Sequence, residues 1–168
     1  MAVVGDIYNA LDSFCPFEVH EPWDNVGLLV GEKESEVRRA AVVLDITHEE
    51  IKKAKAIGAD LIISHHPVIF NPIKSVTKGS VPYELVASSI NALCCHTPLD
   101  IADGGTNDSL AELLGINVTR ADDPILRLGT VEPTTAQELA GKISNTLNTK
   151  VRYADAGKTI KKIAICTG

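Results

Sequence analysis

The sequence has no excess of basic residues, no long apolar run and no long apolar leader. Against 22 Asp and Glu it has only 16 Lys and Arg, so the net charge is −6 and the pI is near 5.3. This balance argues against a nucleic-acid-binding face, which is normally basic. No apolar run approaches the roughly 20 residues that a membrane span requires. The first residues lack a basic start and an apolar core, so we expect no signal peptide and a cytoplasmic location.

Several familiar motifs are also missing. None of the four cysteines forms a C-x-x-C pair, which argues against a zinc knuckle or a thioredoxin-like centre. Cys94 and Cys95 lie in a predicted strand, where we interpret them as small core residues rather than redox groups. The chain has no H-E-x-x-H, G-x-S-x-G, P-loop or G-x-G-x-x-G motif and no internal repeat. No common motif therefore assigns an enzyme class.

The composition that remains is that of a folded α/β protein. Hydrophobic residues make up 45% of the 168 positions and charged residues 23%, a usual balance for a globular chain. The length suits one domain, or one domain and part of another. The composition changes slightly near residues 120–130. We therefore expect a first α/β lobe over residues 1–125 and the beginning of a second α/β lobe over residues 126–168.

Apolar strands alternate with amphipathic helices through the first lobe. Strands are predicted at 40–44, 61–64 and 92–95, and helices at about 3–14, 47–57 and 82–91. Further elements are predicted as strands at 124–131, 150–153 and 161–166 and a helix from Thr134 or Thr135 to Leu147. Thr47 and Glu50 have the capping-box spacing, and Gly58 suits a helix C-terminus. Strand–helix–strand order predicts a mostly parallel sheet flanked by helices, in a three-layer-like arrangement.

Two adjacent histidines, His65 and His66, follow the second of these strands. Pro67 has no N–H for a strand ladder, so the pair should lie where the strand ends and a loop begins. In α/β sheets ligands bind beyond the carboxyl ends of the strands. Adjacent side chains in extended backbone point to opposite sides, so the pair could face two metals, or one metal and its surroundings. Imidazole is the commonest metal-donating side chain.

Other polar residues follow the neighbouring strands. Asp45 follows the strand at 40–44, and His96 and Asp100 follow the strand at 92–95. Because parallel strands end at one edge, these groups can converge. Histidine and carboxylate together suit Zn, Fe, Mn, Co or Ni without selecting one. A pair of metals bridged by Asp100 would activate a water and polarise a carbonyl or phosphoryl oxygen. Asp45 is interpreted as a loop residue or an outer hydrogen-bond acceptor.

Structural interpretations compete with these. A lone pair of histidines more often caps helices or satisfies a core hydrogen bond than binds metal. We interpret His48 as a surface residue and His20 as a loop residue. Trp23 could line a site, but its spacing favours the anchor of a packed loop. Gly104 and Gly105 could cradle a phosphate at a helix N-terminus, although a plain turn is the simpler explanation.

Taken together, the motifs resemble those of the NIF-three family. They are WDNVGL at 23–28, SHHP at 64–67, HTPLD at 96–100 and GGTND at 104–108. Members of this family are often labelled GTP cyclohydrolase I type 2 homologues or dinuclear metal-binding proteins. The resemblance implies a two-lobed α/β fold, up to two divalent metals per subunit facing a cavity, and a ring-like homohexamer.

The resemblance also implies roles for single residues. His65 and His66 match the paired histidine ligands, one for each metal, and Asp100 matches the aspartate ligand. His96 matches the histidine that opens the HTPLD motif and is expected near the metals; from their positions in the chain, Asp45 and Trp23 are expected near them too. The family continues with a later His-x-x-x-Glu that supplies the remaining ligands. We therefore expect this chain to be the amino-terminal portion of a longer protein, with an incomplete dimetal centre of its own.

Two classes of function follow. The first is a GTP cyclohydrolase-like, metal-dependent hydrolase acting on a nucleotide or related small molecule, although the sequence shows no pterin or guanine pocket. The second is a non-catalytic regulatory or scaffold protein that binds metal and a partner. A third possibility is a folded remnant with an empty site. No residue is assigned a catalytic role, and enzyme status stays open.

Overall fold

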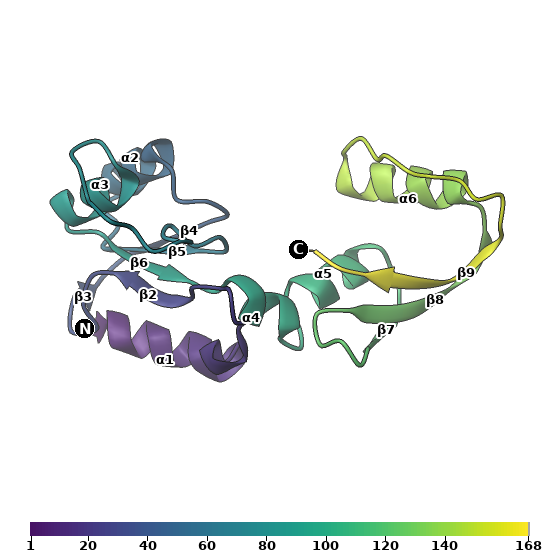
Figure 1. The fold of residues 1–168 in the computed structure, drawn as a ribbon, viewed down its shortest axis with the longest axis horizontal. Helices are drawn as coiled ribbons and strands as arrows, with labels where there is room; N and C mark the ends of the chain where they lie inside the picture. The colour runs from purple at the N-terminus through teal and green to yellow at the C-terminus, as the bar shows by residue number, and fades with distance from the viewer. Residues whose placement is uncertain (168) are drawn as a thin grey trace. The chain divides into compact units, whose positions relative to one another are not determined.

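The computed structural model describes residues 1–167 of the chain (Figure 1). They form two compact units, the first comprising Met1–Ala102 and the second beginning at Asp103. Composition placed the lobe boundary later, between residues 125 and 126. The strand that follows residue 126 pairs with a strand that precedes it in the chain, so both strands belong to the second unit. The boundary therefore falls before both of them. No helix of the described residues is long and apolar enough to cross a membrane.

A four-stranded sheet organises the first unit. Its spatial order is β2 (Gly27–Val30), β6 (Asn91–Cys94), β5 (Leu61–Ser64) and β4 (Ala40–Val43). The three strands predicted from the apolar runs are parallel, as expected, and β2 pairs antiparallel with β6. Their last residues lie in register, because Val43 pairs with Ser64 and Ser64 pairs with Cys94. The carboxyl ends of the parallel strands therefore meet at one edge.

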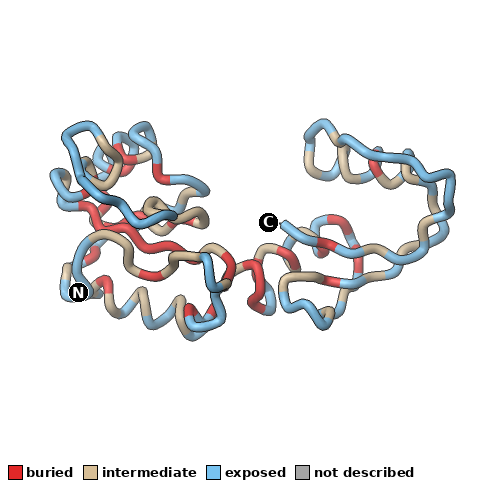
Figure 2. The backbone as a smooth tube through the Cα atoms, viewed as in Figure 1, coloured by how far each residue is buried: buried red, intermediate tan, exposed pale blue. Residues whose placement is uncertain are grey.

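Helices cover both faces of this sheet, which makes three layers (Figure 1). On one face lie α2 (His48–Ala56) and α3 (Val81–Ala87), and on the other lies α1 (Val4–Phe14). Neighbouring residues of β5 pack on opposite faces of the sheet. Ile62 packs with α2 and α3, and Leu61 packs with α1. Figure 2 shows the buried backbone concentrated in the central strands. The predicted α/β class with a mostly parallel sheet is confirmed.

The start of α2 follows the predicted signal in part. Thr47 Oγ1 accepts a hydrogen bond from the Glu50 N–H at 3.2 Å, and Gly58 follows the helix with a φ of +67°. Glu50 does not close the capping box, however, because its carboxylate pairs with Lys53 at 3.0 Å. The helix therefore begins where the sequence predicts, with one of the two expected cap contacts.

The first unit also contains short elements that the sequence did not predict. They are β1 (Ala2–Val3), the 3-10 helix η1 (Phe17–Val19), β3 (Glu36–Val37) and α4 (His96–Ile101). The last of these matters most, because the segment expected to be a loop after β6 is helical. Pro98 lies in its first turn, where a missing N–H costs no intrahelical bond.

The second unit pairs an antiparallel sheet with two helices. Its elements are α5 (Thr106–Leu113), β7 (Val118–Arg120), β8 (Arg127–Thr134), α6 (Ala136–Leu147) and β9 (Ile160–Ile165), with sheet order β7-β8-β9. Thr135, one of the two predicted caps, begins α6, and it forms a capping box with Glu138 that was not predicted. The strand predicted at 150–153 is absent, because β9 takes the pairing edge of β8.

Candidate metal centre

Backbone hydrogen bonds continue the parallel pairing one step beyond the strands. The His65 N–H donates to the Val43 carbonyl at 3.2 Å, and the His66 N–H donates to the Leu44 carbonyl at 2.9 Å. On the other side the His96 N–H donates to the His65 carbonyl at 3.0 Å. The residues that follow the three strands are therefore held next to one another, as the strand pattern predicts.

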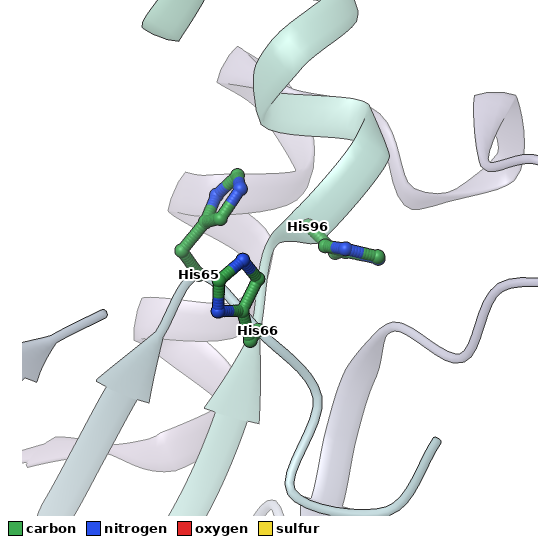
Figure 3. Close-up of side chains that lie close together, drawn as sticks. All are labelled: His65, His66 and His96. Atoms are coloured by element: carbon green, nitrogen blue, oxygen red, sulfur yellow. The ribbon is translucent and has the colours of Figure 1, made fainter. Parts of the chain in front are cut away.

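The side chains of His65, His66 and His96 converge at this edge (Figure 3). One nitrogen from each lies within 4.8 Å of the others, a spacing that could hold a metal ion. The ring centroid of His65 lies 4.9 Å from that of His66 and 5.5 Å from that of His96. His65 and His96 are mostly buried and His66 is half exposed, so the cluster has a protected side and an open side.

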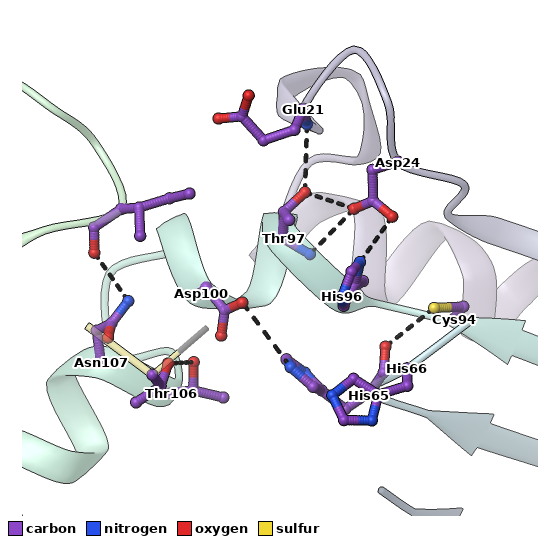
Figure 4. A network of polar contacts seen from close by, with 12 residues as sticks. Glu21, Asp24, His65, His66, Cys94, His96, Thr97, Asp100, Thr106 and Asn107 are labelled. Carbon is purple, nitrogen blue, oxygen red and sulfur yellow. Dashed lines mark hydrogen bonds and ion pairs between the residues drawn. The ribbon is translucent and has the colours of Figure 1, made fainter. Parts of the chain in front are cut away.

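Asp24 fixes the orientation of His96. Its side chain is fully buried, and one carboxylate oxygen accepts a hydrogen bond from His96 Nδ1 at 2.6 Å (Figure 4). The other oxygen accepts from Thr97 Oγ1 at 2.6 Å and the Thr97 N–H at 3.3 Å. Burial alone would raise the pKa of Asp24, but these bonds and one from the Asn25 N–H hold it below its usual value. With Nδ1 engaged, Nε2 of His96 is the nitrogen available to an ion.

The other two histidines also lie beside carboxylates. His66 Nδ1 lies 2.7 Å from Asp45 Oδ1, so Asp45 has the geometry of the outer acceptor that the sequence suggested. His65 Nε2 lies 3.8 Å from Asp100 Oδ2, which is ion-pair range but too long for a hydrogen bond. A carboxylate behind a histidine fixes its tautomer and makes its free nitrogen a better donor, as in many metal sites.

His65 is held in the form that a metal requires. Burial lowers its pKa, and this effect outweighs the opposite effect of Asp100, so the ring is neutral at pH 7. Its Nδ1 is buried and has no hydrogen-bond partner among the described residues. Leaving such an atom unsatisfied costs about 1–3 kcal/mol. Neutral imidazole is the metal-binding form, so this donor set fits a divalent transition metal.

The structure brings together most of the residues proposed from sequence. His65 and His66 are adjacent, and buried Asp100 lies beside His65. His96, expected only near the metals, contributes a nitrogen to the same group. Trp23 is 57% exposed, so it is not the buried loop anchor that its spacing favoured. Asp24 was not proposed as a site residue, although it lies in the WDNVGL motif.

The other residues named below agree with their structural interpretations. His48 is paired with Glu84 on the surface, and the Gly104 N–H donates to the Asp108 carboxylate at 2.7 Å within a turn. Cys94 Sγ donates to the His65 carbonyl at 3.0 Å, and burial raises the pKa of its thiol to about 12. A thiol that stays protonated is a poor ligand and a poor nucleophile. Cys94 therefore serves packing and the positioning of the His65 backbone.

This fold and site define the class: an α/β protein with a histidine cluster, suited to metal, beyond the carboxyl ends of its parallel strands. The chain belongs to the Duf34/NIF3 (NGG1p interacting factor 3) family, with a match over residues 2–168. The family resemblance seen in the sequence motifs is thereby confirmed.

Relatives and solved structures agree with this assignment. A Clostridium perfringens protein named "GTP cyclohydrolase 1 type 2 homolog" is 36% identical over 180 residues, covering 98% of this chain and 69% of that protein. A Streptomyces coelicolor protein of the same name is 33% identical, covering 100% of this chain and 66% of its own length. The Staphylococcus aureus hypothetical protein SA1388 has a TM-score of 0.90 at 26% identity, over 96% of this chain and 70% of that one. Reduced HcgD from Methanocaldococcus jannaschii has a TM-score of 0.74 at 28% identity, over 85% and 59%.

Proposed function

We propose that this chain carries the metal-binding part of a dinuclear metal protein that hydrolyses a nucleotide-like small molecule. The observation that carries the proposal is the convergence of three histidine nitrogens within 4.8 Å, with a carboxylate beside each ring. The name shared by the curated relatives supports chemistry on a nucleotide. Because those relatives are longer than this chain, the proposal concerns the whole protein.

His65, His66 and Asp100 are the proposed ligands, and the geometry adds His96 as a candidate. Divalent metals at such a site activate a water and polarise a carbonyl or phosphoryl oxygen. The family resemblance implies further ligands from a His-x-x-x-Glu motif, in addition to these four residues. The three-histidine group offers donors for one ion, and Asp100 lies where a carboxylate could share in its coordination.

Two carboxylates orient the histidine ligands without being proposed as ligands themselves. Asp24 holds His96, and Asp45 holds His66, each through Nδ1. Both contacts set the tautomer with the proton on Nδ1, so that Nε2 carries the lone pair. The open side at His66 gives a small molecule access, and the buried side at His65 keeps water away from the carboxylate of Asp100.

The second candidate is a metal-binding regulatory or scaffold protein without turnover. The family description itself, NGG1p interacting factor 3, names an interaction, which favours this alternative. The two candidates share the metal centre and differ in whether a small molecule is turned over.

Elemental analysis of protein purified without chelator or nickel resin tests the metal centre. We expect bound divalent metal in the native chain and its loss in His65→Ala. His48→Ala, which removes a surface histidine paired with Glu84, is the matched control and should retain metal. Metal far below one per chain in the native protein would contradict the proposal for these residues.

Hydrolysis assays with GTP and related nucleotides then separate the two functions. Metal-dependent turnover that His65→Ala abolishes would support the hydrolase. Bound metal without turnover, together with partner binding that survives His65→Ala, would support the regulatory protein instead.

A further inference from the structure

Two exposed aromatic side chains lie beside the histidine cluster. Trp23 is 57% exposed and Phe70 is 45% exposed, and their ring centroids are 5.9 Å apart with an interplanar angle of 51°. Aromatic residues are only 4% of this chain, and Trp23 is its only tryptophan. Large apolar rings that remain accessible next to a polar site typically mark a binding surface.

His96 connects these rings to the other histidines. Its ring centroid lies 6.1 Å from that of Trp23 and 6.2 Å from that of Phe70, both in edge-on arrangements. The same His96 ring lies 5.5 Å from His65 and 5.7 Å from His66. Because the two rings are tilted by 51°, a flat group can stack on one of them with its edge toward the other, close to His96.

Hydrogen bonds hold the two aromatic loops in place. Asn25 Nδ2 donates to the Ile69 carbonyl at 2.6 Å, which ties the residue after Asp24 to the residue before Phe70. Asp24, which follows Trp23, is anchored by His96 and Thr97. Both rings are thus exposed and still positioned by their neighbours. A surface arranged before binding loses less entropy when a ligand arrives.

We infer that Trp23 and Phe70 form a stacking site for a planar heteroaromatic ring, and that this ring class defines the substrate. The inference deepens the proposed function and rests on it for the chemistry, though not for the binding. Stacking suits this surface because every nucleobase has a π-face that an exposed indole or phenyl ring can cover. Two rings beside polar groups are too small a surface for a protein partner, which commonly covers about 800 Å² per side.

The single tryptophan makes the inference directly measurable. Guanosine 5′-monophosphate would be titrated into the full chain with fluorescence excited at the red edge of the indole band, and ribose 5-phosphate would be the ring-free control. We expect saturable quenching with the first and none with the second, both with EDTA and with added zinc. Phe70→Leu should weaken the guanosine monophosphate affinity about 10-fold, because one of the two aromatic contacts with the base is lost.

Further variants separate stacking from general effects. Trp23→Leu, followed by calorimetry, should lose binding, whereas Trp23→Phe should recover part of it. Tyr153→Leu, which removes an exposed aromatic from the second unit, should leave the affinity unchanged. Circular dichroism should show the same fold in all of them, because the substituted rings are exposed.

The outcomes distinguish this inference from the proposed function. No quenching, equal quenching by both ligands, or native affinity in Phe70→Leu would overturn the stacking site. Quenching in a protein that binds no metal would retain the stacking site and reject the metal centre. Metal-dependent turnover with no preference for ligands that carry a heteroaromatic ring would retain the metal centre and reject the stacking site.

Discussion

At the scale of single residues, the candidate site is a set of histidines whose rings are fixed from behind. Asp24 is the most deeply placed of the carboxylates, and it receives hydrogen bonds from a ring, a hydroxyl and backbone N–H groups. Both oxygens of the ionised carboxylate therefore accept hydrogen bonds, although the side chain is buried. The consequence for His96 is a fixed ring with one nitrogen free for an ion.

Asp24→Asn should weaken zinc binding by about 10–100-fold, the usual effect of removing the partner behind a ligating histidine. Asparagine keeps the size of the side chain but loses the charge that favours a proton on His96 Nδ1. Competition with a zinc-sensitive dye measures the affinity, and Asp122→Asn, an exposed position in the second unit, is the control. Native zinc affinity in Asp24→Asn would show that the buried carboxylate does not support the site.

Gly31 follows β2 and allows that strand to end against β6. Its φ is +107°, and a Cβ at this position would lie 1.9 Å from Asn91 Oδ1, the atom that accepts from the Glu32 N–H. Gly31→Ala should therefore cost about 2–4 kcal/mol in the free energy of unfolding, through overpacking and backbone strain together.

Urea unfolding measures this loss, and Gly79→Ala is the matched control. Gly79 has a φ of +93°, but a Cβ there would meet no heavy atom within 4 Å. Only backbone strain of about 1–2 kcal/mol therefore applies to Gly79→Ala. Equal losses for the two variants would mean that contact with Asn91 contributes nothing.

At the scale of elements, α4 decides how the third histidine is presented. His96 is its first residue and has a φ of +24°, an uncommon conformation for a residue with a side chain. Strained residues of this kind concentrate at functional sites. The turn from β6 into α4 also places Asp100, one helical turn later, on the side of His65. A plain loop after β6 would hold neither group in place.

The connection between α5 and β8 depends on an ion pair between Asp108 and Arg127. Arg127 is buried, and its guanidinium contacts both Asp108 oxygens and the Pro124 carbonyl. Burial alone would raise the pKa of Asp108, but the Arg127 and Gly104 hydrogen bonds lower it below its usual value. Because the folded pKa is the lower one, this pair stabilises the fold above the unfolded pKa near 4 and is lost as the pH falls through the folded pKa.

Asp108→Asn should therefore lower the free energy of unfolding at pH 7 by about 2–3 kcal/mol, since it removes the Asp108 charge from beside the buried Arg127 guanidinium. The difference from the native protein should shrink as the pH is lowered from 5 to 2. Thermal unfolding across this pH range measures the trend. A difference independent of pH would show that packing, and not the ionised carboxylate, is responsible.

At the scale of the whole molecule, the described chain consists of two units with separate secondary structure. The histidines and their supporting carboxylates all belong to the first unit, Met1–Ala102. The second unit has its own antiparallel sheet and its own helix cap at Thr135. Metal binding should therefore raise the stability of the first unit.

Hydrogen exchange with and without zinc tests this separation. Zinc at 100 times its dissociation constant should stabilise the unit that binds it by about 2.7 kcal/mol. We expect slower exchange in β4, β5 and β6, and unchanged exchange in β8, α6 and β9. Equal protection throughout would mean that the two units unfold together, and His65→Ala should abolish the protection in either case.

Much of the site was predictable because its geometry follows from regular structure. Parallel pairing aligns strand ends, so apolar runs alternating with helices were enough to bring His65, His66 and His96 to one edge. Asp45 followed from the same reasoning. The helix α4 was not predictable, because Pro98 directly after His96 and Thr97 reads as a loop signal, and the first-turn position that tolerates proline appears only in the fold.

Sequence patterns were enough to identify the family, the alternation of the three parallel strands with helices in the first unit, and the edge at which the histidines lie, since each depends on motifs or local periodicity. Tertiary structure alone decided the partners of those histidines. Asp24 is 72 positions from His96 along the chain, and it reaches the ring because β2 pairs antiparallel with β6. The contact of Trp23 with Phe70 also joins distant segments, which the hydrogen bond from Asn25 to the Ile69 carbonyl holds together. Contacts of this kind depend on packing between distant segments, which local sequence patterns do not specify.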